Sequence, residues 1–224
     1  MSAMLRSGAR GWSWSLVIFF VTLVMVACSS KSGGSNGGGR KTGDDCDPDA
    51  GAAGPSLLAN GSFEQPAVPV GGFTAFTTGQ SFGGWTVMGE TGDVAPLSSA
   101  FLSAGFAFTA EDGQQAVDLT GTTDTATGIQ QAVTTTAGHA YCLSFWVGNI
   151  YNPGGAYGVD STINVLMDGN LISVATNADQ DPAQLSWQPF TTTIVATGSS
   201  TRIAFVNADP ASDSSNFIDN VTLR

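Results

Sequence analysis

Short apolar alternations, separated by glycine, asparagine, aspartate and threonine, fill residues 56–224 and limit the fold more than any other feature of this chain. Residues 141–147 alternate with a period of two, so one face of the predicted strand carries Tyr141, Leu143, Phe145 and Val147. Cys142 and Trp146 then lie on the opposite face. No window of useful length has the periodicity of an amphipathic helix. The pattern therefore predicts an all-β domain.

Further segments with strand patterns follow at the spacing typical of a β-sandwich. They are residues 161–167, 171–174, 191–195, 202–206 and 217–223. The sequence Asp168-Gly-Asn170 separates the first two and predicts a hairpin turn. A domain of this length can bury a substantial core on its own. We expect one domain over residues 56–224.

The charge of the predicted domain limits the kinds of partner that the domain can bind. The whole chain has a formal net charge of −11, and residues 1–55 hold five basic against four acidic side chains, which leaves −12 for residues 56–224. A domain this acidic is not expected to bind nucleic acid. It should be soluble and repelled by anionic lipid surfaces, and its carboxylates are available for cations.

The N-terminus has the pattern of an export signal. Arg6 and Arg10 precede an apolar run over residues 16–27, which is shorter than the ~18 residues of a membrane span. Met25-Val-Ala-Cys28 resembles the lipobox of bacterial lipoproteins, in which the cysteine is acylated. We expect residues 1–27 to be a lipoprotein signal peptide and Cys28 to carry the lipid. The alternative is an ordinary signal peptide with an incidental cysteine.

A linker is predicted between the lipid and the domain, over residues 28–55. Ser29 stands where an inner-membrane retention signal would have aspartate, so an outer-membrane lipoprotein, periplasmic or surface-exposed, is expected. Residues 29–39 are rich in Gly and Ser and predict a flexible tether. The acidic stretch at residues 44–49 is interpreted as a solvated linker or, alternatively, a calcium chelator.

Two cysteines remain once Cys28 is acylated. An exported compartment permits Cys46 and Cys142 to form a disulfide. The alternative is that Cys142 is a small buried residue and Cys46 a free thiol.

Several motifs occur in an order that resembles one family. They are Leu57-Leu-Ala-Asn-Gly-Ser-Phe-Glu64, Gly84-Trp-Thr-Val87, Asp112-Gly-Gln-Gln-Ala-Val-Asp-Leu119, Gly128-Ile-Gln-Gln131, Tyr141-Cys-Leu-Ser-Phe145, Gly148-Asn149 and Ile218-Asp-Asn-Val-Thr-Leu223. The set is similar to bacterial choice-of-anchor C proteins and to plant cell-wall proteins with the domain of unknown function six-four-two. The resemblance implies a galactose-binding-like jelly-roll β-sandwich and, as partner, a polysaccharide or cell-envelope glycan.

The resemblance also suggests one structural calcium ion that joins the two ends of the domain. Glu64 and Asp219 match the carboxylates of such a site, and Asp112 or water would complete the oxygen ligands. The alternative is that Glu64 and Asp219 accept hydrogen bonds in turns.

Catalysis is not expected. The only histidine, His139, lies in a turn before a strand, and the sequence has no nucleophile elbow, zinc spacing or phosphate-binding loop. A hydrolase with paired carboxylates stays open, because separations in space are invisible in the sequence.

A candidate ligand site follows from strand parity. Trp146 points away from the core, and Asn149, Tyr151 and Asn152 follow in a loop rich in Gly and Pro, so flat apolar and amide groups could converge on one sugar ring. The alternative is that Trp146 is covered and completes a second small core.

Trp85 and Trp187 are expected inside the sandwich, at positions that look like the family's buried ones. We predict a lipid-anchored, non-catalytic binding module for polysaccharide or envelope glycan, which contacts the membrane only through its lipid. The alternative is a structural or protein-interaction domain that serves as spacer or adhesin.

Overall fold

The computed structural model describes residue 46, residues 54–181 and residues 184–224. The predicted signal peptide, Cys28, the Gly/Ser tether and most of the acidic cluster lie outside these residues. Within the described ranges, no helix has the length and apolar character that crossing a bilayer requires.

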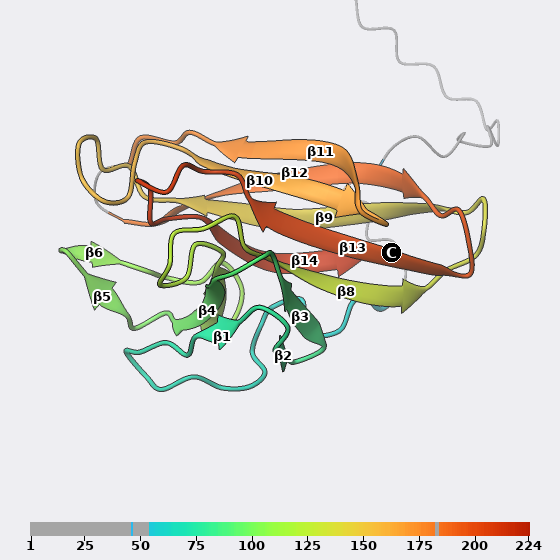
Figure 1. Cartoon of the computed structure of the whole chain (residues 1–224), viewed down its shortest axis with the longest axis horizontal. Helices are drawn as coiled ribbons and strands as arrows, with labels where there is room; N and C mark the ends of the chain where they lie inside the picture. Colours follow the sequence, from blue (N-terminus) through green and yellow to red (C-terminus); the bar gives the residue numbers. More distant parts are fainter. Residues whose placement is uncertain (1–45, 47–53, 182–183) are drawn as a thin grey trace, which may run out of the picture. The chain divides into compact units, whose positions relative to one another are not determined.

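Two antiparallel six-stranded sheets form the domain (Figure 1). Sheet 1 has the spatial order β1 (Phe76–Thr77), β4 (Asp93–Ser98), β7 (Gln115–Asp118), β14 (Phe217–Leu223), β9 (Ala140–Asn149) and β12 (Ser186–Val195). Sheet 2 has the order β11 (Asn170–Asn177), β10 (Ser161–Met167), β13 (Ser200–Asn207), β8 (Gly128–Thr134), β3 (Trp85–Met88) and β2 (Ser81–Phe82). A separate hairpin pairs β5 (Leu102–Ser103) with β6 (Phe106–Ala107). The prediction of an all-β jelly-roll sandwich is confirmed.

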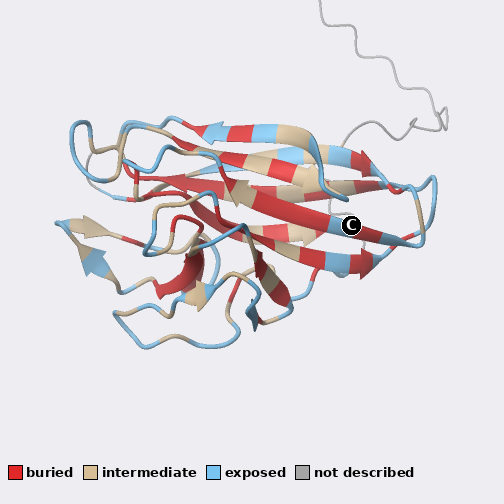
Figure 2. Ribbon diagram, viewed as in Figure 1, coloured by how far each residue is buried: buried red, intermediate tan, exposed pale blue. Residues whose placement is uncertain are grey.

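The main core lies between the two sheets. Its largest fully buried side chains include Trp85, Phe63, Phe145 and Phe205. Trp85 lies 5.5 Å from the Phe63 ring centroid and 6.1 Å from that of Phe205. Along β9, buried and half-buried residues alternate from Tyr141 to Val147, as the period of two predicts (Figure 2).

A second apolar cluster lies on the opposite face of sheet 1. Ile218 belongs to the main core and Phe217 to the second cluster, and neighbouring residues of one strand point to opposite faces. The buried members of this second cluster are Leu97, Phe108, Ile150, Leu185 and Phe217. Trp187, expected inside the sandwich, packs against the second cluster and is only half-buried. The outer face of sheet 1 is therefore partly covered.

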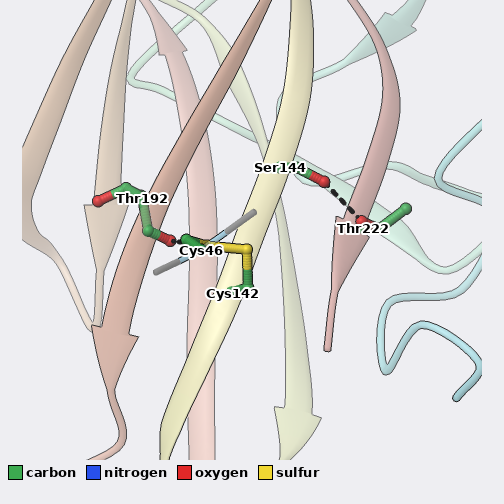
Figure 3. The surroundings of a disulfide bond; sticks show 5 residues. All are labelled: Cys46, Cys142, Ser144, Thr192 and Thr222. Carbon is green, nitrogen blue, oxygen red and sulfur yellow. Dashed lines mark hydrogen bonds between the residues drawn. A yellow bond between two sulfur atoms is a disulfide. The ribbon is translucent and has the colours of Figure 1, made fainter. Parts of the chain in front are cut away.

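The two ends of the domain are fastened to the centre of sheet 1. Leu57 donates its N–H to the carbonyl of Leu223 at 2.8 Å, and Cys142 exchanges two backbone hydrogen bonds with Arg224. Cys46 and Cys142 form a disulfide, with 5.3 Å between their Cα atoms (Figure 3). The segment around Cys46 is thus bonded covalently to β9, 96 residues further along the chain.

An aromatic-lined pocket on the outer face of sheet 1

A pocket of about 190 Å³ opens on the outer face of sheet 1. It is lined by Phe73, Ala95, Leu97, Phe101, Ser103, Phe108, Asp118, Gly121, Thr122, Tyr157, Ser214 and Phe217. Seven of these are apolar or aromatic and the remainder are small or polar. This composition is typical of a site for a small organic ligand.

Strand register builds the floor of the pocket. Ala95 on β4 pairs with Asp118 on β7, and Asp118 pairs with Phe217 on β14. Residues directly opposite each other in a sheet share a face, so these three side chains form a row across the sheet. Ile218 and Val117, one position away, point into the main core. The floor therefore lies on rigid strands.

Aromatic rings form the walls. Phe73 contacts Phe101 edge-on at 5.7 Å between centroids, and Phe101 contacts Phe108 at 5.3 Å. Phe108 also lies 5.8 Å from Tyr157 and 5.5 Å from Phe217. Edge-to-face contacts at these distances are favourable, so the rings hold one another in place.

The β5–β6 hairpin covers one side of the pocket and is fixed at two places. The hydroxyl of Tyr157 donates a hydrogen bond to the Ser103 hydroxyl at 2.8 Å. The indole N–H of Trp187 donates to the carbonyl of Thr109 at 2.9 Å. The first bond joins the hairpin to the loop after β9, and the second joins the segment just after the hairpin to β12.

Asp118 is the carboxyl group of the pocket. Its Oδ1 accepts hydrogen bonds from the backbone N–H of Thr120 at 2.9 Å and from the Thr120 hydroxyl at 2.6 Å. Burial raises the pKa of Asp118 to about 7, although these hydrogen bonds act in the opposite direction. Near neutral pH the group exists in both protonation states.

Further carboxyl groups lie behind this end of the pocket. Burial raises the pKa of Asp209 to about 8 and that of Asp213 to about 6, with a smaller contribution from the negative charge of neighbouring aspartates. From residue 54 onward the chain has only Arg202 and Arg224 as basic side chains other than histidine, and neither lines the pocket. This end of the molecule is therefore electronegative.

We expect the domain to be more stable at about pH 5 than at about pH 8. Asp118, Asp209, Asp213 and Asp219 each have a folded-state pKa above the ordinary value of 3.8. The folded state then binds more protons than the unfolded state, so the free energy of unfolding falls as pH rises from about 4 to about 8. Urea unfolding across this range measures the slope. A stability that rises over the range would contradict the protonation of these groups.

The structure separates the four residues predicted to bind ligand. Trp146 lies half-buried on the outer face of sheet 1, between Pro189 of β12 and Asp219 of β14 in register. It does not line the pocket.

The other three belong to or adjoin the loop after β9. Asn149 is fully buried, and its amide donates to the carbonyls of Val159 and Asp179. Tyr151 and Asn152 are half-buried, and the same loop reaches the pocket through Tyr157. The sequence pattern therefore found the loop but not the residue that lines the pocket.

The three residues predicted to bind calcium meet at one loop, residues 111–115. Asp219 Oδ2 accepts the backbone N–H groups of Glu111 and Asp112. Glu64 Oε1 accepts those of Gln114 and Gln115, while Asp112 is exposed.

Backbone N–H groups thus bond to one carboxylate oxygen of Glu64 and to both oxygens of Asp219. Across the part of the chain that the structure describes, no group of three or more His, Cys, Asp or Glu is arranged to hold a metal ion. Calcium binding by Glu64, Asp219 and Asp112 stays a prediction that elemental analysis of the purified protein would check.

His139 is exposed in its turn, with its ring 4.7 Å from that of Tyr141, and lies outside the pocket. The pocket residues missed by the sequence reasoning include Phe101 and Phe108, and with Phe106, which packs against the second cluster, they put three phenylalanines within eight positions. That density of rings in a short segment was the available signal for a covering hairpin.

Comparison with known proteins gives one family and a set of distant structural likenesses. A family model described as HpiC1-like, HpiC1 cyclase, matches residues 55–224. No curated protein matches the chain.

Three solved structures illustrate the structural likenesses. The CBM22-1 xylan-binding domain from Paenibacillus barcinonensis Xyn10C has a TM-score of 0.42 and 17% identity, over 70% of this chain and 97% of that one. A family 35 carbohydrate-binding module from Clostridium thermocellum has a TM-score of 0.41 and 12% identity, over 67% and 96%. The sugar-binding EclA C-terminal domain has a TM-score of 0.35 and 22% identity over 42% of this chain, which spans 64% of that domain.

Proposed function

We propose that this chain, which belongs to the HpiC1-like family, is a non-catalytic module that binds a sugar unit of a glycan in the aromatic-lined pocket. A lipid on Cys28 would hold the module at the outer membrane. The relation to choice-of-anchor C proteins stays a prediction from the sequence motifs.

One observation carries the binding proposal. The pocket combines five aromatic rings with hydroxyl and carboxyl groups, over a floor of strand residues that the sheet keeps rigid. A sugar ring has an apolar C–H face and a polar rim, so a pocket with these two kinds of wall complements it. At about 190 Å³ the pocket is smaller than the ~300–1,000 Å³ of drug-sized sites, which suits one ring or the end of a chain.

A pair of variants tests where the glycan binds. Phe73 is 44% exposed at the pocket, so Phe73→Ala should weaken glycan binding by about tenfold with little loss of stability. Trp146→Ala is the matched control at the site expected from the sequence. A glycan array with each variant of the mature protein gives the comparison. If only Trp146→Ala loses binding, the site lies on the open sheet face and the pocket proposal is wrong.

If neither variant nor the unaltered protein binds any glycan on the array, the alternative of a spacer or adhesin is favoured. Neither a spacer nor an adhesin that binds protein requires a pocket for a small ligand. The partner of an adhesin would be a protein. The pocket would then be a packing defect between the hairpin and the sheet.

A second candidate function is acid-catalysed cyclisation of an apolar substrate. The family model that matches is described as a cyclase, and the pocket holds a carboxyl group whose pKa of about 7 suits proton donation near neutral pH. Asp118→Asn keeps the shape of the side chain and removes the proton. Under this candidate it would abolish turnover of a cyclisable substrate, whereas a binding module would turn over none in either form.

The lipid anchor is tested by Cys28→Ala. This variant should move from the membrane fraction to the soluble fraction, because a lipid chain is the only membrane contact expected of so acidic a domain. Cell fractionation with an antibody against the domain checks it. A variant that still sediments with membranes through an uncleaved N-terminus would overturn the lipoprotein interpretation.

A further inference from the structure

We infer that the pocket selects a ligand with a positively charged amine, which for a glycan means a sugar unit with a free, unacetylated amino group. This inference rests on the proposed function and adds the charge of the ligand to it. Three observations support it: the pocket has aromatic walls, it contains a carboxyl group, and the charged side chains around it are acidic.

The walls favour a cation. Five aromatic rings, those of Phe73, Phe101, Phe108, Tyr157 and Phe217, line a space that holds about one sugar ring. An ammonium group close to aromatic rings is attracted by their negative faces, and the attraction grows when water is excluded. Neutral sugars gain only the stacking contact from the same rings.

The floor favours the same charge. Asp118 contributes a carboxyl group to the pocket, and its hydrogen-bond donors are all neutral: the backbone N–H and hydroxyl of Thr120 and the backbone N–H groups of Gly121 and Asn216. No basic side chain of residues 54–224 lines the pocket. A carboxylate removed from water without a cation is unfavourable, so a ligand ammonium would supply the missing counter-charge.

The surroundings exclude an acidic ligand. The carboxyl groups of Asp160, Asp209 and Asp213 interact electrostatically with one another, and Asp118 contributes to the field at Asp209. Asp124 adds to the field at Asp213, and Asp93, from β4, accepts hydrogen bonds from Thr122 in the pocket wall. A sugar carboxylate entering this region would meet only like charge among the described side chains.

The affinity for an amine should depend on pH with a defined sign. Between about pH 6 and about pH 8 the Asp118 carboxyl, whose pKa lies near 7, loses its proton, and the ionised form attracts an ammonium more strongly. Binding of a ligand whose ammonium keeps its charge throughout, such as benzyltrimethylammonium, should therefore strengthen over this range and release a proton when it occurs at the lower pH. A neutral sugar should show little change.

Calorimetry on the full mature chain with three probes tests the inference. The probes are a glucosamine oligomer, the N-acetylglucosamine oligomer of equal length and a galacturonate oligomer. We expect the glucosamine oligomer to bind about tenfold more tightly than its acetylated counterpart, and the galacturonate oligomer not to bind. Asp118→Asn should remove the preference, and Glu90→Gln, which removes an exposed carboxylate outside the pocket, should keep it.

The outcomes separate three claims: the preference for an amine, the binding of a glycan and the presence of a cation site. Equal binding of the amine and acetylated oligomers, or binding of galacturonate, overturns the inference and leaves glycan binding intact. If no oligomer binds and the glycan array is also negative, the proposed function fails, and benzyltrimethylammonium then serves as a probe without a sugar. Binding of this cation, lost in Asp118→Asn, supports the cation site, and its failure to bind overturns that as well.

Discussion

Replacing Cys46 and Cys142 together by serine is expected to lower the free energy of unfolding by about 2–4 kcal/mol. The disulfide closes a loop with a sequence separation of 96 residues, and closure of so long a loop restricts the unfolded chain strongly. Cys142 is only half-buried, so little packing is lost in the substitution itself. Urea unfolding of the oxidised protein and the double variant measures the difference.

Reduction provides an independent control for this result. A reducing agent should lower the stability of the unaltered protein to that of the double variant and leave the variant unchanged. If the double variant is as stable as the oxidised protein, Cys46 is not bonded to Cys142 in solution. Mass spectrometry of the unreduced chain would then show two free thiols.

Trp85→Ala should cost about 3–5 kcal/mol, the largest effect expected of a single substitution in this domain. The indole is fully buried between the sheets, packs against Phe63 and Phe205, and donates its N–H to the carbonyl of Asn60 at 3.0 Å. Truncation leaves a cavity and removes one of the two hydrogen bonds that the Asn60 carbonyl accepts.

Trp146→Ala is the matched control, because it removes the same side chain from a half-buried position on the outer face. Its cost should be clearly smaller. Denaturant unfolding with an unchanged m-value for both variants would confirm that only native-state packing differs. Equal costs would mean that Trp146 is as deeply packed as Trp85, which would also remove it as a ligand platform.

The regular strands could be predicted from local sequence because their apolar residues alternate with a period of two. β9 alternates from Tyr141 to Val147, and Asp168 and Gly169, both with positive φ, form the turn between β10 and β11 as the Asp-Gly pair predicts. The strand expected at residues 191–195 is β12, which begins earlier, at Ser186. Pro189 argues against a strand in the sequence, so the first residues of β12 were not predicted. The proline is tolerated because β12 is an edge strand.

The pocket could not be predicted in the same way, because its parts meet only through long-range register. β4 is buried at every position from Asp93 to Ser98, so it lacks the alternation that identifies a strand with one solvated face. The second cluster causes this burial by covering the outer face. The burial of Asn149 could not be predicted for a related reason: its amide donates to the carbonyls of distant loops, which a local pattern cannot reveal.

The bond between Cys46 and Cys142 also decides how the domain would respond to mechanical load. A pull on the N-terminal side of Cys46, opposed at the C-terminus, would pass through the disulfide into β9 and onward to β14. Strands β1 to β8 lie inside the covalent loop and would bear no tension along the chain. The floor residues Ala95 and Asp118 and the β5–β6 hairpin belong to this shielded part, so a stretched tether would leave that side of the pocket unloaded.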